Sequence, residues 1–167
     1  MRLGDLFYDP ILRESDAEHH AALRQTGFFG KAGAGCIFLA RSTGRILLAH
    51  RSEMVEQPGT WGGWGGAINS GEDPEQAVRR EVAEEAGYHG DFDMVPLFVF
   101  KKDSFRYYNF LVEVDDEFRP VLDWETQGSR WCEWGEWPRP LHFGLVSLFN
   151  DPGSVRRIER AINAPRD

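Results

Sequence analysis

The sequence predicts an α/β protein in which a central mixed β-sheet lies between helices, an α/β/α sandwich. Three observations lead to this expectation: short apolar runs rich in β-branched and aromatic residues, a capped amphipathic helix between two groups of such runs, and two helical patterns at the C-terminal end. The chain has 167 residues, 41% of them hydrophobic, which suits one domain with a sizeable core. We therefore interpret residues 1–167 as a single domain.

Residues 1–30 are interpreted as an N-terminal extension. Ser15 or Asp16 could cap a short helix that carries His19 and His20. Adjacent histidines point to different helix faces, so we expect surface residues rather than a metal-binding pair. No apolar run is long enough for a signal peptide or a membrane span, which predicts a soluble, cytoplasmic protein.

Four short apolar runs predict strands. Ala34–Ala40 and Ile46–His50 flank a Ser-Thr-Gly turn, and Met94–Lys101 and Phe105–Val114 flank a second turn, so each pair predicts antiparallel strands. A fifth strand is expected at Arg130–Trp134. The helical patterns at the C-terminal end span residues Leu141–Phe149 and Ser154–Asn163.

The segment Gly65–Tyr88 carries the strongest local signals. Asp73 is a suitable N-cap, proline follows at the first helical position, and Gln76 completes a capping box. Gly87 stands where a helix commonly stops in the left-handed conformation. These signals predict a helix over residues 74–86.

This helix places glutamates beside its apolar stripe, which consists of Val78, Val82 and Ala86. At about 100° per residue, Glu85 falls roughly 20° from Val78 and Glu81 about 60° from it. A solvated glutamate face is the ordinary alternative, but Glu81, Glu84 and Glu85 repel one another, and Arg80 alone cannot compensate three anions. A divalent cation would, and hard oxygen ligands favour Mg²⁺ or Mn²⁺.

A glycine pair precedes the helix. Gly65 and Gly66 allow a close approach to the backbone, and residues 67–72 lead to a helix N-terminus, which favours anions. A glycine pair alone more often marks a tight turn. Its position beside the acidic helix instead indicates a site for an anionic ligand together with a metal ion.

The segment resembles the Nudix box, Gly-x5-Glu-x7-Arg-Glu-U-x-Glu-Glu-x-Gly-U, where U is a bulky aliphatic residue. Eight positions match at the required spacing: Gly66, Glu72, Arg80, Glu81, Val82, Glu84, Glu85 and Gly87. Only the last position departs, because Tyr88 replaces an aliphatic residue. The chain is thereby identified as similar to the Nudix (MutT-like) hydrolases, whose α/β/α sandwich agrees with the pattern of strands and helices.

The resemblance implies Mg²⁺-dependent hydrolysis of a phosphoanhydride in a nucleoside diphosphate linked to another moiety. Nucleoside triphosphates, nucleotide sugars, ADP-ribose and dinucleotides all belong to this class, and the sequence does not choose among them. The metal ligands it implies are the Gly65 carbonyl, Glu81, Glu84 and Glu85. The catalytic residues it implies are Arg80 and a general base, which is left open among Glu84, Glu81 and Glu125, with Asp123 as the alternative to Glu125. Glu72 and Gly87 have structural roles in the motif.

Candidate substrate-binding residues are Arg51, Gly66, Trp64 and Tyr107. Arg51 ends the second strand, where the family often has a basic residue, although an ordinary surface arginine is equally compatible. Trp64 takes the place of the family's usual proline, and both Trp61 and Trp64 could stack on a base or simply pack into the sheet. For Tyr107, core filling is the alternative.

The net charge and the two cysteines bear on the alternative functions. A net charge of −8 argues against non-specific nucleic-acid binding. Cys36 and Cys132 lack metal-ligand spacing and are expected to be buried free thiols. A non-catalytic nucleotide sensor and a diphosphate isomerase remain as alternatives, but sensors usually lose box glutamates and an isomerase needs an additional acid or thiol base. A homodimer is possible, as it is among relatives.

Overall fold

The computed structural model describes residues 32–166, so the expected helix with His19 and His20 lies outside the described residues. Within this range one sheet contains the strands β1 (Ala32–Ala40), β2 (Ile46–Arg51), β3 (Trp61–Gly62), β4 (Trp64–Ala67), β5 (Asp93–Lys102), β6 (Phe105–Val114) and β7 (Thr126–Cys132). The strand order is β3-β2-β1-β6-β5, while β4 pairs with β1 and β7 pairs with β2. Among the strands of residues 32–166, β1 and β6 pair in parallel and the other pairs are antiparallel, so the sheet is mixed, as predicted.

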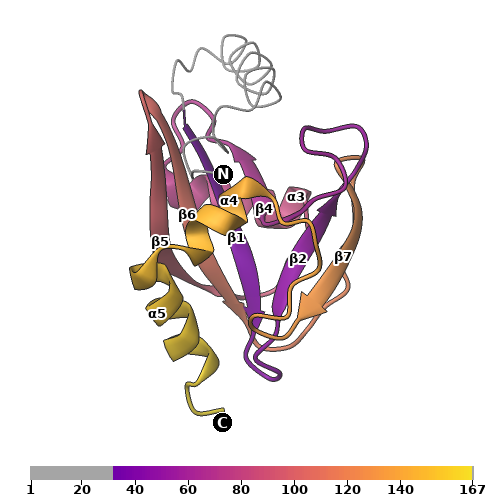
Figure 1. Ribbon diagram of the computed structural model, residues 1–167, viewed down its shortest axis with the longest axis vertical. Helices are drawn as coiled ribbons and strands as arrows, with labels where there is room; N and C mark the ends of the chain where they lie inside the picture. The colour runs from indigo at the N-terminus through magenta and orange to yellow at the C-terminus, as the bar shows by residue number, and fades with distance from the viewer. Residues whose placement is uncertain (1–31, 167) are drawn as a thin grey trace.

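Helices cover both faces of this sheet (Figure 1). They are α3 (Pro74–Glu84), α4 (Phe143–Phe149) and α5 (Pro152–Ile162). The helix α3 packs against β1 and β4, whereas α4 and α5 pack against β5 and each other on the opposite face. The predicted α/β/α sandwich is therefore confirmed.

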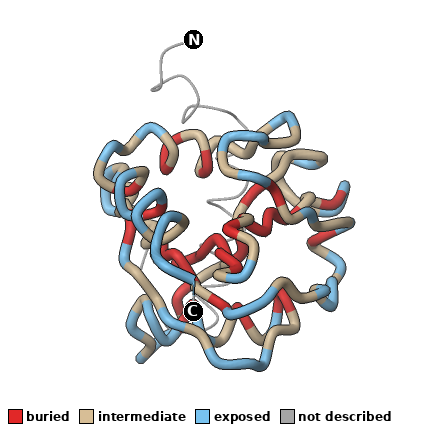
Figure 2. The backbone as a smooth tube through the Cα atoms, turned by 90° about the horizontal axis from the view of Figure 1, so that it is seen from below, coloured by how far each residue is buried: buried red, intermediate tan, exposed pale blue. Residues whose placement is uncertain are grey.

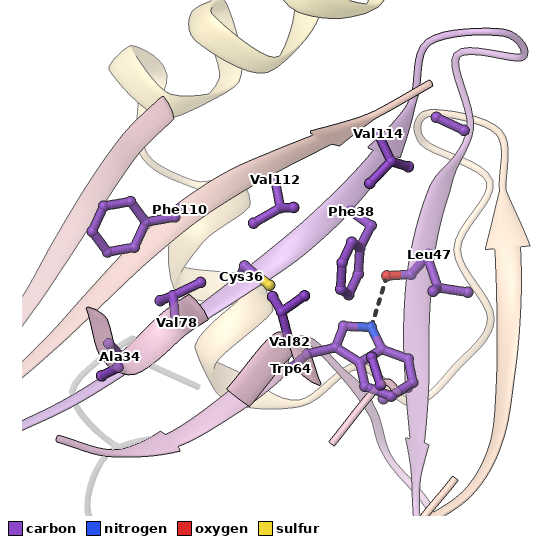
Figure 3. Packing of buried hydrophobic residues seen from close by; sticks show 14 of the residues in the cluster. Ala34, Cys36, Phe38, Leu47, Trp64, Val78, Val82, Phe110, Val112 and Val114 are labelled. Atoms are coloured by element: carbon purple, nitrogen blue, oxygen red, sulfur yellow. Dashed lines mark hydrogen bonds between the residues drawn. The ribbon is translucent and has the colours of Figure 1, made fainter. Parts of the chain in front are cut away.

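The central strand β1 shows why the helices divide in this way. Its even-numbered residues, including Cys36 and Phe38, join the cluster that contains Val78 and Val82 of α3, as Figure 3 shows. Its odd-numbered residues Ile37 and Leu39 join the cluster that contains the apolar residues of α4 and α5. Because side chains alternate along a strand, an unbroken apolar run is buried on both sides. Buried backbone accordingly lies at the centre of the molecule (Figure 2).

The start of α3 matches the prediction closely. The Asp73 carboxylate accepts from the Gln76 N–H at 2.8 Å, and the Gln76 amide oxygen accepts from the Asp73 N–H at 2.9 Å. The helix ends at Glu84, two residues earlier than expected, and Gly87 adopts a φ of 64°. A left-handed residue there explains why glycine closes the motif.

Further boundaries also differ from the expectation. No strand was expected within residues 61–67, but β3 and β4 lie there, because pairing with β2 and β1 compensates for a glycine-rich composition that has no strand pattern. The strand expected at residues 130–134 is β7, which starts at Thr126 with polar residues that an apolar pattern does not detect. The helix α4 starts after its cap, His142, two residues later than expected. None of the helices in residues 32–166 has the length and apolar character that a membrane crossing requires.

Candidate active site

The glycine pair of β4 lies next to Glu81 of α3 and to Glu85, which caps the C-terminal end of this helix. The Gly65 N–H donates to Glu85 Oε2 at 2.6 Å. A Cβ atom at Gly66 would lie 2.6 Å from Glu81 Oε1, and one at Gly65 would lie 2.3 Å from the Ala34 carbonyl oxygen. Glycine is therefore needed at both positions, and Gly66 leaves room for the Glu81 carboxylate beside the backbone. Spacing of four residues puts Glu81 and Glu85 on the same helix face.

Arg80 connects the other carboxylates of the motif. Its guanidinium donates twice to Glu72, at 2.9 and 3.1 Å, once to Glu81 at 2.8 Å and once to Glu84 at 3.2 Å. A fifth bond, of 2.8 Å, reaches the Ala67 carbonyl oxygen. The Arg80 guanidinium holds the pKa of Glu72 below its usual range. The pair between Glu72 and Arg80 thus ties the loop before α3 to the helix and orients the Glu81 carboxylate.

The loop before β7 is fixed to the end of β2. The Ser52 N–H donates to the Glu125 carbonyl oxygen at 2.9 Å, and the Ser52 hydroxyl donates to the Trp124 carbonyl oxygen at 2.8 Å. The Glu125 N–H donates to Asp123 Oδ1 at 2.9 Å. These bonds hold Glu125 and Asp123 at the edge where β2 and β7 pair.

Carboxylates from α3 and from this loop share one electrostatic environment. Burial raises the pKa of Glu85 well above its ordinary value, and the charges of Glu81, Glu125 and Asp123 raise it further, against the Gly65 hydrogen bond. Burial raises the pKa of Glu81, although the Arg80 charge acts in the opposite direction. Burial also raises the pKa of Glu125, with Asp123 and Glu81 adding to the effect. Negative charge therefore accumulates at this place in partly buried surroundings.

Arg51 is a cation near these carboxylates. Its Nε donates to the Glu56 carbonyl oxygen at 2.8 Å, and within residues 32–166 it forms no ion pair. Its charge lowers the pKa of Glu125 and of Tyr107, so it lies near both. A guanidinium held by backbone with no carboxylate partner is free to bind an anion.

Tyr107 lies over the glycines of β1. The parallel pairing of β6 with β1 places it opposite Gly33, and a Cβ atom at Gly35 would lie 2.1 Å from its hydroxyl oxygen. A Cβ atom at Gly65 would lie 2.8 Å from the same oxygen. Burial raises the pKa of Tyr107, and the Glu85 charge raises it further, so the hydroxyl stays protonated. It therefore lies beside the glycine pair as a neutral hydrogen-bonding group.

The two tryptophans of the glycine-rich segment are engaged within the protein. Trp64 has no exposed surface, and its indole N–H donates to the Leu47 carbonyl oxygen at 3.3 Å (Figure 3). Its inclusion among the substrate-binding candidates is not supported, because β4 turns it into the core cluster around Phe38. Trp61 stacks on His50 at 4.3 Å and lies under the Arg130 guanidinium at 5.2 Å. Packing is thus the role that the structure gives both rings.

The donor set suits a hard divalent cation. It consists of carboxylates with raised pKa values beside a backbone glycine pair, and their charge exceeds that of Arg80 and Arg51. Within residues 32–166, however, no three carboxylate, histidine or cysteine side chains converge in a metal-ligating arrangement. One oxygen of Glu85 accepts from the Gly65 N–H and one oxygen of Glu81 accepts from Arg80, which leaves the second oxygen of each carboxylate for a ligand.

Both cysteines are buried free thiols, as expected. Cys36 lies on the α3 side of β1, and burial raises its pKa well above the ordinary value, with Glu85 and Glu81 adding to the effect. A thiolate is therefore disfavoured at the position closest to the carboxylates.

Comparisons with known proteins agree with this geometry. A protein of Mycobacterium tuberculosis that carries the name 8-oxo-dGTP diphosphatase 3 is 44% identical over 64 residues, which are 36% of this chain and 30% of the relative. The oxidized purine nucleoside triphosphate hydrolase of Danio rerio is 29% identical over 99 residues, which are 50% of this chain and 61% of the relative. The matched regions thus span less than two thirds of either relative's length.

Solved structures share the fold. MutT from Aliivibrio salmonicida and Vibrio cholerae gives a TM-score of 0.58 at 23% identity, covering 77% of this chain and 97% of the other. The E. coli dihydroneopterin triphosphate pyrophosphohydrolase gives a TM-score of 0.57 at 20% identity, and the match covers 80% of this chain and 97% of the other. The family model of the NUDIX domain matches residues 31–150. With the box residues gathered at α3 and the fold in agreement, the chain belongs to the Nudix family.

Proposed function

We propose that this chain hydrolyses a phosphoanhydride bond of a nucleoside diphosphate linked to another moiety. An oxidised purine nucleoside triphosphate such as 8-oxo-dGTP is the first substrate to consider, because two relatives carry names of that activity. Nucleotide sugars, ADP-ribose and dinucleotides are the other members of the class. The expected products are a nucleoside monophosphate or its equivalent, with pyrophosphate or a phosphorylated compound.

One observation carries the proposal: carboxylates from α3 and from the loop before β7 accumulate beside a glycine pair, near an arginine, Arg51, that forms no ion pair within residues 32–166. Burial and mutual repulsion raise the pKa values of Glu81, Glu85 and Glu125, so this charge arrangement destabilises the protein on its own. A divalent cation with a bound diphosphate would compensate both the carboxylates and Arg51.

Glu81, Glu84, Glu85 and the Gly65 carbonyl would hold Mg²⁺, or Mn²⁺ in its place. When bound, the cation neutralises phosphate charge and makes a bound water more acidic. Arg80 and Glu72 act as positioning residues, because the guanidinium donates to the Glu81 carboxylate and is itself held by Glu72. Arg51 binds a phosphate oxygen and keeps the reacting phosphorus near the carboxylates.

Among the candidate bases, the geometry favours Glu125. Within the described residues its carboxylate accepts no hydrogen bond, whereas Glu81 and Glu84 accept from Arg80. Burial raises the pKa of Glu125, which makes it a better proton acceptor near neutral pH than an ordinary glutamate. Asp123 remains the alternative, and its fixed bond to the Glu125 N–H suits a supporting role.

The rival readings have less support. A sensor on this fold would not require the complete set of Glu72, Glu81, Glu84 and Glu85 that the chain retains. An isomerase would need a thiol or acid base, and burial keeps Cys36 protonated.

The test is a hydrolysis screen with and without Mg²⁺ across 8-oxo-dGTP, dGTP, ADP-ribose, a nucleotide sugar and a dinucleoside polyphosphate, with products identified by mass. We expect turnover of one of them, and loss of that turnover in Glu84→Gln. Glu75→Gln is the matched control, because Glu75 is an exposed glutamate of the same helix whose one ion pair within residues 32–166 is with Arg79. Equal activity of the two variants, or no turnover by the wild type, would contradict the proposal.

A further inference from the structure

His142 is a residue that the sequence did not single out, and backbone contacts fix it beside β3. Its N–H donates to the Trp61 carbonyl oxygen at 2.8 Å, and the Trp61 N–H donates to the Pro140 carbonyl oxygen at 2.9 Å. The ring caps α4, since His142 Nδ1 accepts from the Gly144 N–H at 3.0 Å. A backbone N–H can only donate, so Nδ1 carries no proton and the ring proton is on Nε2.

The Nε2–H group is a donor without an acceptor. No group of residues 32–166 accepts a hydrogen bond from it, although the ring is partly buried. Burial lowers the pKa of His142 to about 3, and the charge of Arg51 contributes, so the ring is neutral across the physiological range. A fixed, neutral donor with no protein partner is suited to a ligand.

The ring lies next to the phosphate-binding end of the proposed site. A Cβ atom at Gly62 would lie 3.4 Å from His142 Cβ and 3.9 Å from Arg51 Cδ, so both side chains pass over this glycine. The charge of Arg51 also lowers the pKa of Glu125 and of Tyr107. Arg51 therefore lies near the carboxylates and also near His142. If the diphosphate spans the carboxylates and Arg51, the nucleoside is the part of the substrate that reaches His142.

We propose that His142 is a specificity-determining residue whose Nε2–H donates a hydrogen bond to an acceptor atom of the substrate's nucleoside. This inference rests on the proposed function, because Arg51 must bind a phosphate for the nucleoside to lie there. A donor that cannot accept favours a carbonyl oxygen or an unprotonated ring nitrogen and rejects an amino group at that place. The residue thus contributes to the choice of nucleoside and does not act on phosphorus.

The test separates this role from helix capping. His142→Asn keeps an acceptor for the Gly144 N–H, because asparagine is among the best N-caps, but it has no group that reaches the Nε2 position. Asp151→Asn is the matched control, a cap exchange at α5, where Asp151 accepts from the Ser154 N–H. The probes are guanosine 5′-monophosphate and inorganic pyrophosphate, each titrated calorimetrically with Mg²⁺ present.

In His142→Asn we expect binding of the monophosphate to weaken about tenfold, as for one lost hydrogen bond, and binding of pyrophosphate to stay unchanged. Two-bond ¹H–¹⁵N spectra of the wild type should show the Nε2–H tautomer, with an Nε2 shift that moves on adding the monophosphate but not pyrophosphate. Equal weakening for both probes, unchanged monophosphate binding, or a proton on Nδ1 would overturn the inference and leave the proposed hydrolysis intact. Binding of neither probe by the wild type, together with absent turnover, would overturn both.

Discussion

Replacing Arg80 perturbs the hydrogen-bond network that organises the acidic motif. Its five hydrogen bonds link three glutamates and the Ala67 carbonyl oxygen, and its side chain is 24% exposed, against 19% for Glu72 and 15% for Glu81. Exposed pairs contribute at most about 1 kcal/mol, while breaking a buried pair costs about 3–5 kcal/mol. For this intermediate burial we expect Arg80→Ala to lose about 2 kcal/mol of unfolding free energy, which lowers Tm by about 4–8 °C in a chain of this size.

Arg80→Lys sharpens the prediction. Lysine keeps the charge but cannot form the two parallel bonds to Glu72, so we expect it to lose about half as much as the alanine variant. The assay is urea unfolding at pH 7 and again in acid. Because Arg80 lowers the pKa of Glu72, this part of the stability is present above the ordinary glutamate pKa and is lost as the pH falls through the lowered value. The difference between Arg80→Ala and the wild type should therefore shrink in acid. Wild-type stability in both variants, or a difference that grows in acid, would refute the reasoning.

Further predictions concern the glycine pair, the buried glutamate and the core. Gly66→Ala should displace the Glu81 carboxylate and lower kcat about 100-fold with little change in Tm. A variant with the wild-type kcat would contradict the inference that a Cβ atom at Gly66 crowds Glu81. Glu85→Gln should abolish turnover. Burial raises the pKa of Glu85, so the metal-free wild type should lose stability as the pH rises above 4.5. The Glu85→Gln variant should lack this decline when thermal unfolding is followed against pH. Identical pH profiles of Tm for the two proteins would argue against a buried charge. Trp64→Ala should cost about 3–5 kcal/mol in urea unfolding, and Trp64→Phe less, with KM unchanged in the latter; a raised KM at wild-type stability would restore Trp64 as a substrate contact.

The elements that could be predicted from the sequence are those set by residues close together in the chain. The helix α3 begins where Asp73 and Gln76 form their capping box and stops before Gly87, because caps act over a few residues. The apolar stripe of Val78 and Val82 is buried as its spacing predicts. The pair between Arg80 and Glu84 also follows from their spacing of four residues, since helical turns bring such residues together.

Features that depend on pairing between distant strands could not be predicted in this way. The strands β3 and β4 exist because β2 and β1 pair with a glycine-rich segment. The parallel register between β1 and β6 places Tyr107 beside Gly35, which are 72 positions apart in the chain numbering. His142 lacked any signal in the sequence, because its surroundings come from Trp61 and Arg51 rather than from its neighbours.

The most direct test is a titration of the metal-free protein with Mn²⁺, followed by electron paramagnetic resonance and compared among the wild type, Glu84→Gln and Glu75→Gln. The central claim is that the carboxylates at the end of α3 bind divalent cations. It predicts specific Mn²⁺ binding by the wild type and by Glu75→Gln, displaced by Mg²⁺, and binding at least about tenfold weaker in Glu84→Gln. The same affinity in all three proteins, or no specific binding by any of them, would contradict the claim.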